Sequence, residues 1–164
     1  MDKSRPIWIG NDHGGYDMKK DLVKRLIEKD YQVHDVGTDS TDIVRYPYFA
    51  AEVAGAVSKG DAEAGILICS TGIGMSIVAN KFKGVRASHC TSTYQARMTR
   101  AHNNSNVLCL GGRITGIFEA LDMLDAWLDT AYEGGRHDIS LGLIEEAERE
   151  IGNAKGWVPR GPRK

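Results

Sequence analysis

Five short apolar runs, separated by segments with helical spacing, restrict the fold of this chain more than any other feature of its sequence. The runs are apolar along most of their length and do not alternate strictly with polar residues. Strands of that kind fit a parallel sheet covered on both faces. A strand with one solvent-exposed face would instead alternate between apolar and polar residues. The expected strands are 6–10, 31–36, 64–69, 85–89 and 106–110.

Helices are expected between these strands and after the last one. In the first, 16–30, Met18, Leu22 and Leu26 recur at the spacing of one helix face. The alternation predicts a doubly wound α/β fold with a five-stranded parallel sheet, Rossmann-like or flavodoxin-like, and an additional C-terminal helix. That last helix lies outside the βα units, which makes a neighbouring subunit a candidate partner for its apolar face. The other expected helices are 48–59, 74–82, 92–102, 117–128 and 143–151.

Composition excludes several classes of protein. The 164 residues suffice for one domain without cross-links. The chain has 21 basic and 22 acidic residues and a net charge of -1, so no strong field draws it to nucleic acid or to a membrane. No apolar run has the length of a membrane span or the form of a secretory signal. We therefore expect a cytoplasmic protein that binds neither nucleic acid nor membranes.

Cysteine and histidine spacing argues against disulfides and metals. Cys69, Cys90 and Cys109 are odd in number and form no C-x-x-C pair, and the last two are expected to be small buried hydrophobes. The five histidines show neither H-x3-H nor H-E-x-x-H spacing, so we expect no metal site.

We expect one domain over 1–152 and a disordered basic tail over 153–164, because the tail shows no apolar period.

Glycine-rich polar segments follow three of the expected strands, which is where ligands bind in open α/β sheets. The strongest is 69–74, where Cys69 ends a strand and Ser70-Thr71-Gly72-Ile73-Gly74 opens a helix, so that backbone N–H groups can converge on an anion. A helix N-terminus also favours a thiolate, which would let Cys69 act as a base. Alternatively, the glycines only permit a tight turn. Neither a dinucleotide fingerprint nor a P-loop is present.

Four other polar segments are weaker candidates. Asp12-His13 could orient hydroxyls and bind phosphate, or could serve only as a turn element. His102-Asn103 ends a helix, where the dipole alone can explain a histidine. Arg113 and Arg136 each follow a Gly-Gly pair, which exposes a guanidinium to a phosphate, although exposed arginines are commonly only solvated.

Taken together, these motifs resemble those of the ribose-5-phosphate isomerase B and galactose-6-phosphate isomerase family. The matches run in family order along nearly the whole chain, which makes the set highly specific. They are Gly10-x-Asp12-His13-x-Gly15, Lys19-Lys20, Asp35-x-Gly37, Tyr46-Pro47, Gly65-Ile66-Leu67-Ile68-Cys69-x-Thr71-Gly72-x-Gly74, Ala79-Asn80-Lys81, Arg86-Ala87, His102-Asn103-Asn104, Asn106-Val107-Leu108, Gly112-Arg113 and Gly134-Gly135-Arg136-His137.

The resemblance implies an aldose–ketose isomerase domain that needs no cofactor and acts on a sugar phosphate through an enediolate. Ribose 5-phosphate is the first substrate to expect, with erythrulose 4-phosphate, allose 6-phosphate and galactose 6-phosphate as alternatives. Cys69 would move the proton between C1 and C2, and the amides of Ser70 to Gly74 would stabilise the oxyanion. Thr71 and His102 would assist opening of the furanose ring.

The same resemblance implies further substrate contacts and an assembly. The implied assembly is a homodimer, or a dimer of dimers, in which the C-terminal helix crosses to the partner and both subunits build each active site. The residues implied to contact the substrate are Asp12 and Asn103 at its hydroxyls, His13, Arg113 and Arg136 at its phosphate, Gly72, Ile73 and Gly74 at its oxyanion, and Tyr46.

Two positions depart from the family pattern. Many members carry a second arginine where this chain has Ser140, and an aspartate where it has Arg45. We hypothesise that Arg45 offsets the missing guanidinium or adapts the pocket to a sugar of different length. Two hypotheses compete with the isomerase: a non-catalytic nucleotide- or flavin-binding module, and a structural or regulatory relative without activity. The second is disfavoured because the candidate residues occur together.

Overall fold

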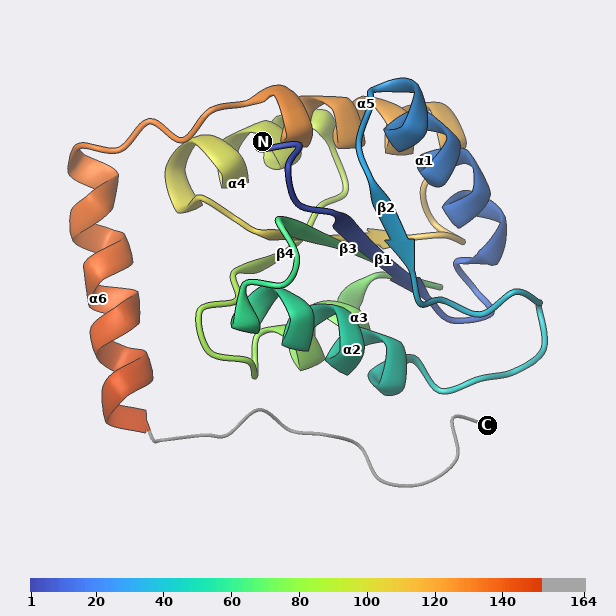
Figure 1. Ribbon diagram of the computed structural model, residues 1–164, viewed down its shortest axis with the longest axis horizontal. Coiled ribbons are helices and arrows are strands. Elements are labelled where there is room, and N and C mark those ends of the chain that lie inside the picture. Colours follow the sequence, from blue (N-terminus) through green and yellow to red (C-terminus); the bar gives the residue numbers. More distant parts are fainter. Residues whose placement is uncertain (152–164) are drawn as a thin grey trace.

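The computed structural model describes residues 1–151 and shows the expected five-stranded parallel sheet (Figure 1). The strands lie in the order β2-β1-β3-β5-β4, and every neighbouring pair is parallel. The predicted doubly wound α/β fold is therefore confirmed. The strands are β1 (Ile7–Asn11), β2 (Val33–Asp35), β3 (Ala64–Cys69), β4 (Ala87–His89) and β5 (Val107–Gly111).

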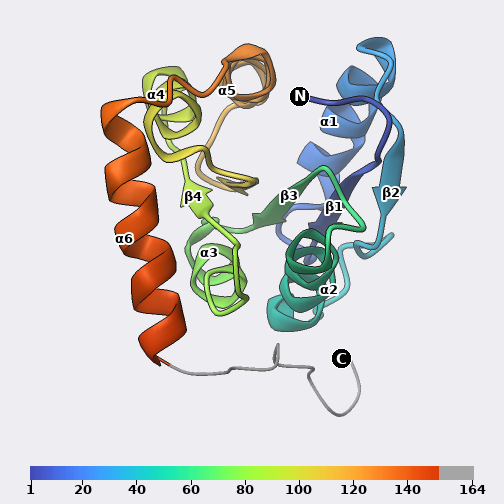
Figure 2. The ribbon, with the colours of Figure 1, turned by 60° about the vertical axis from the view of Figure 1, so that its left-hand side comes forward.

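Helices cover both faces of the sheet (Figures 1 and 2). One face packs against α1 (Tyr16–Glu28), α4 (Thr93–Asn103) and α5 (Ile117–Asp129), and the other packs against α2 (Tyr46–Lys59) and α3 (Ile73–Ala79). Each layer has its own apolar cluster, and the strands contribute alternate side chains to the two clusters. The central strands are buried along their full length for this reason.

Strand order decides which loops meet. The order β2-β1-β3 is that of a flavodoxin-like sheet, whereas β5 here lies between β3 and β4. The chain passes from β1 outward to β2 and then returns across β1 to form β3, so β1 and β3 flank a topological switch point. The edge strands β2 and β4 have three residues each, are shorter than the sequence predicts and are only partly buried or exposed.

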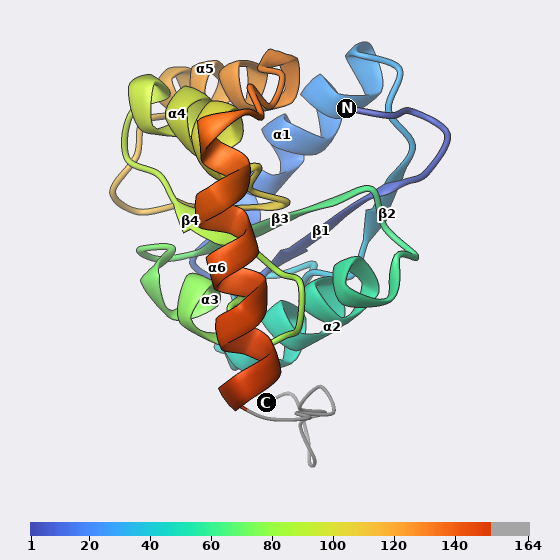
Figure 3. The same cartoon turned by 90° about the vertical axis from the view of Figure 1, so that its left-hand side faces the viewer.

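The last helix, α6 (Arg136–Ile151), begins seven residues before the predicted start at Leu143. Its first two turns carry mostly exposed side chains, so the apolar period that marks the predicted helix does not reach them. Gly134 and Gly135 both have positive φ and set the chain direction before the helix starts. Figures 1 and 2 show α6 standing apart from the two layers beside the β4 edge, and Figure 3 looks onto it from outside; α6 contacts α4.

Two expectations concern membranes and the end of the chain. Among the described helices, none combines the length and the apolar character that crossing a membrane requires. The predicted tail over 153–164 lies outside the described residues.

A buried hydrogen bond links α5 to the segment before β5. The Trp127 indole Nε1–H donates to Ser105 Oγ at 2.8 Å, and both side chains are fully buried. Replacing Ser105 with alanine leaves the indole donor without its acceptor, and an unsatisfied buried donor costs about 1–3 kcal/mol. We predict that Ser105→Ala lowers the free energy of unfolding by that amount in urea titrations. Trp127→Phe with Ser105→Ala should cost less than the sum of the two single changes, and full additivity would refute the coupling.

Candidate active site

The carboxyl ends of the three adjacent strands β1, β3 and β5 bring three loops together. Backbone hydrogen bonds fix the loops to one another: Asp12 N donates to Ile68 O at 3.1 Å, Gly112 N to Cys69 O at 2.8 Å, and Arg113 N to Ser70 O at 3.1 Å. Two of these strands flank the switch point of the sheet, which is where open α/β sheets bind ligands. The structure therefore places the three polar segments found in the sequence at one site.

Glycine makes this approach of the loops possible. A Cβ atom at Gly14 would lie 2.8 Å from Ser70 N, and one at Gly112 would overlap Gly14 O. No larger residue fits at either position unless the backbone moves. The segments after β1, β3 and β5 thus pack main chain against main chain, which fixes the spacing of the side chains that they carry.

Cys69 is the last residue of β3 and lies at the base of this site. Its side chain is 5% exposed, and Gly72 N donates to its Sγ at 3.1 Å. Gly72 adopts a left-handed conformation with φ of 79° at the N-cap of α3, a conformation that favours glycine. The Gly72 amide is therefore a hydrogen-bond donor to the sulfur atom that the sequence predicts to be the base.

The other two thiols are unsuited to that chemistry. Burial raises the pKa of Cys90 to about 11 and holds the pKa of Cys109 well above its usual value, so both thiols stay protonated at neutral pH. Their side chains lie in the two apolar clusters, which confirms the prediction that they are small buried hydrophobes. Among the three cysteines, Cys69 alone ends a strand at the loop site.

Asp12 and His13 lie in the loop after β1. The Asp12 carboxylate is buried and accepts a hydrogen bond from Gly14 N at 2.8 Å. Desolvation raises its pKa, against the opposing effects of that hydrogen bond, His13 and Arg113. His13 Nδ1 accepts a hydrogen bond from Val44 N at 3.4 Å, so its other nitrogen carries the proton in the neutral ring and can donate to an anion.

The first turn of α2 closes another side of the site. Tyr46 packs its ring on the first turn of α3, since a Cβ atom at Gly74 would lie 2.7 Å from Tyr46 Cζ. Its side chain remains 37% exposed. Arg45, one residue earlier, is exposed at the N-cap of α2 and follows the residue that bonds His13. The backbone of Arg45 therefore lies next to a residue that contacts His13, which is expected to bind phosphate.

Lys19 is a positioning residue to which the sequence analysis gave no role. Its buried Nζ donates to Thr38 O at 2.9 Å and pairs with Asp35 at 3.0 Å. Asn11 Nδ2 donates to Asp12 O at 2.9 Å and to the same Thr38 O at 3.3 Å. These bonds tie the loop after β1 to the loop after β2. The sequence feature that could have indicated this role is the position of Lys19 next to Met18, on the face of α1 that is buried.

His102, Asn103 and Arg136 do not join this site within one chain. Helix α4 runs antiparallel to the strands, so its last residues lie at the amino ends of the strands; there Gly65 N donates to Asn106 O at 2.9 Å. Strand β3 spans about 17 Å, at about 3.3 Å per residue, between that edge and Cys69. We call His102, Asn103 and Arg136 the amino-edge group. The carboxyl-edge group is Asp12, His13, Tyr46, Cys69 to Gly74 and Arg113.

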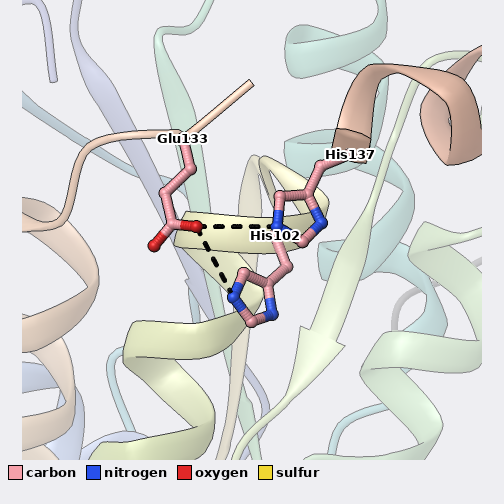
Figure 4. A group of neighbouring side chains, drawn as sticks. All are labelled: His102, Glu133 and His137. Carbon is pink, nitrogen blue, oxygen red and sulfur yellow. Dashed lines mark ion pairs between the residues drawn. The ribbon is translucent and has the colours of Figure 1, made fainter. Parts of the chain in front are cut away.

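A second cluster lies at the amino edge (Figure 4). Glu133 Oε2 is 3.8 Å from His102 Nε2 and 3.5 Å from His137 Nε2. The two imidazoles stack with ring centroids 4.3 Å apart. Glu133 N donates to Ala101 O at 3.0 Å, which fixes the loop before α6 against the end of α4. The three side chains offer the donor types of a metal site, although their sequence spacing does not show one.

Comparisons with known proteins agree with the motifs. The sequence model described as Ribose/Galactose Isomerase matches residues 7–144. The chain is 44% identical over 145 residues to ribose-5-phosphate isomerase B of Escherichia coli, covering 88% of this chain and 97% of that protein.

Solved structures agree as well. One is ribose-5-phosphate isomerase B of Clostridium thermocellum, with a TM-score of 0.88, 46% identity and coverage of 90% of this chain and 99% of that one. Another is the Mycoplasma genitalium enzyme with bound ribulose-5-phosphate, with a TM-score of 0.87, 40% identity and coverage of 91% and 99%. Because the family model matches most of its length, this chain belongs to the ribose/galactose isomerase family.

Proposed function

We propose that this protein interconverts ribose 5-phosphate and ribulose 5-phosphate, with Cys69 as the base. The observation that carries the proposal is the position of Cys69 Sγ, at the end of β3 and 3.1 Å from Gly72 N, where three loops meet. The relatives named ribose-5-phosphate isomerase B support the substrate. No cofactor enters the proposed reaction, because aldose–ketose interconversion only relocates protons and electrons within the sugar.

The proposed reaction proceeds through an enediolate. The Cys69 thiolate removes the proton from C2 of the open-chain aldose, and the electron pair moves through the new C1–C2 double bond to leave a negative charge on O1. Amides of the loop from Ser70 to Gly74 stabilise this oxyanion. A proton passes from O2 to O1, and Cys69 returns its proton to C1, which gives the ketose.

The remaining residues hold the substrate and open its ring. His13 donates to the phosphate through the nitrogen that Val44 leaves free, and Arg113 and Arg136 supply its charge partners. Asp12 and Asn103 bind sugar hydroxyls, Tyr46 borders the sugar, and Thr71 with His102 transfers the protons of ring opening. These roles rest on the family motifs and on the positions of the two groups.

The separation of the two groups supports a homodimer with composite active sites. A two-fold dimer can place the amino-edge group of a second copy over the carboxyl-edge group of the first. Exposed apolar side chains favour such an interface. On α6, Ile139 and Leu143 are 71% and 62% exposed, and Phe118 at the start of α5 is 81% exposed. The position of α6 outside the two layers (Figures 1 and 2) suits a helix that crosses to a partner.

Replacing Cys69 tests the proposed base. We predict that Cys69→Ser folds normally, by circular dichroism and melting temperature, and loses about 100- to 10,000-fold in kcat because a hydroxyl is a much weaker base at neutral pH. Cys90→Ala is the matched control and should keep nearly all activity, since Cys90 lies in the core. Wild-type turnover by the folded serine variant would rule out Cys69 as the base.

Mixed dimers test the composite site. Cys69→Ser and His102→Asn homodimers should both be nearly inactive, whereas a mixed dimer has one site with both groups intact. We predict that random mixing of the two chains after refolding restores about a quarter of wild-type activity, because half of the dimers are mixed and each has one working site. Sites contained within single chains would give no recovery.

A substrate panel tests the sugar. We expect kcat/KM to be highest for ribose 5-phosphate among four-, five- and six-carbon aldose phosphates, each measured by a coupled isomerisation assay. A higher value for a tetrose or hexose phosphate would change the substrate but leave the isomerase chemistry in place. Turnover of none of them by a folded dimer would contradict the proposed function.

A further inference from the structure

Glu133 and His137 lie beside the His102 imidazole, and all three side chains are of types that bind metal ions. The three side chains come from three segments: the end of α4, the loop after α5 and the first turn of α6 (Figure 4). One donor atom from each lies within 4.8 Å of the others. Two imidazoles and one carboxylate form the ligand set of several catalytic zinc sites, with a fourth position left open.

The distances are close to those of a zinc site. Ligand atoms about 2.1 Å from a tetrahedral zinc ion lie about 3.4 Å from one another. Glu133 Oε2 is 3.5 Å from His137 Nε2 and 3.8 Å from His102 Nε2, so two edges of the tetrahedron are nearly formed. The third edge requires one of the stacked imidazoles, whose planes differ by 13°, to rotate until both nitrogens point at the ion. The His102 side chain is 35% exposed and has room to turn.

His137 gives an independent reason to expect a ligand. Its Nε2 atom is buried and makes no hydrogen bond within the described part of the chain, since the approach to Glu133 lacks the required geometry. An unsatisfied buried nitrogen is rare in native proteins and costs free energy. A cation bound between His137 and Glu133 would use that lone pair and would neutralise the carboxylate.

We propose that His102, Glu133 and His137 bind Zn²⁺ and that the bound ion inhibits the isomerase. The ion would occupy the His102 lone pair, which ring opening needs for proton transfer. Binding stands on the geometry of the cluster alone, whereas inhibition rests also on the role of His102 in the proposed function. The cluster is regulatory in this proposal, and the reaction itself needs no metal.

Calorimetry on the full chain with zinc sulfate tests binding. We expect a single ion per chain for the wild type, and an affinity at least about 100-fold lower for Glu133→Gln and for His137→Gln, since loss of even an outer-sphere partner costs about 10- to 100-fold. His34→Gln, which removes an exposed histidine on β2, is the matched control and should bind as the wild type does. Unchanged binding in both cluster variants, or no binding by the wild type, would overturn the proposal.

A separate activity assay measures the effect of zinc on turnover. Zinc should inhibit isomerisation of ribose 5-phosphate at the concentrations that fill the calorimetric site, and a chelator should restore the rate. Each cluster variant, compared with its own zinc-free rate, should need at least about 100-fold more zinc for the same inhibition. Binding without inhibition would retain the zinc site and reject its regulatory effect. An isomerase inactive toward every sugar phosphate would overturn the proposed function and leave the binding result intact.

Discussion

The contact of three main-chain loops at the carboxyl ends of β1, β3 and β5 is the constraint on which the site depends. Gly14 and Gly112 let these loops meet without side chains between them, and the bond from Gly112 N to Cys69 O at 2.8 Å links two of them directly. The sheet order requires this meeting, because β3 and β5 are neighbours although β4 separates them in the chain. The positions of Asp12, Cys69 and Arg113 depend on it.

The sequence allowed the sheet and the carboxyl-edge group to be predicted, since both depend on local patterns. Strands β3 and β5 are apolar because both of their faces are buried, and chain direction in a parallel sheet places the loops after these strands at one edge. The sequence did not reveal the early start of α6 at Arg136, because its exposed first turns carry no apolar period. Nor did it reveal the role of Lys19, which depends on its contacts with a distant loop.

The motifs also did not show how the candidate residues divide between the two edges of the sheet. The family resemblance implied active sites built by both subunits without assigning residues to each, and the antiparallel course of α4 shows that His102 lies at the opposite edge from Cys69. The cluster of His102, Glu133 and His137 was missed for a similar reason. Its members Glu133 and His137 are one helical turn apart in sequence, whereas His102 reaches them only because the loop before α6 bonds to the end of α4.

The division of the candidate residues between two edges of the sheet would explain why the proposed enzyme works as a dimer. Under the proposed roles, neither edge of one chain holds every group for isomerisation, so a homodimer would explain both the exposed apolar face of α6 and the split site. The proposed zinc cluster at the amino edge would then place a metal response at His102, one of the two residues proposed to open the ring, and would leave Cys69 unchanged.

A crystal structure of the protein with ribulose 5-phosphate tests the composite site most directly. We predict that the sugar lies with C1 and C2 beside Cys69 of one chain while His102, Asn103 and Arg136 of a second chain reach its other side. A ligand bound away from Cys69, or one enclosed by Cys69 and His102 of the same chain, would contradict it.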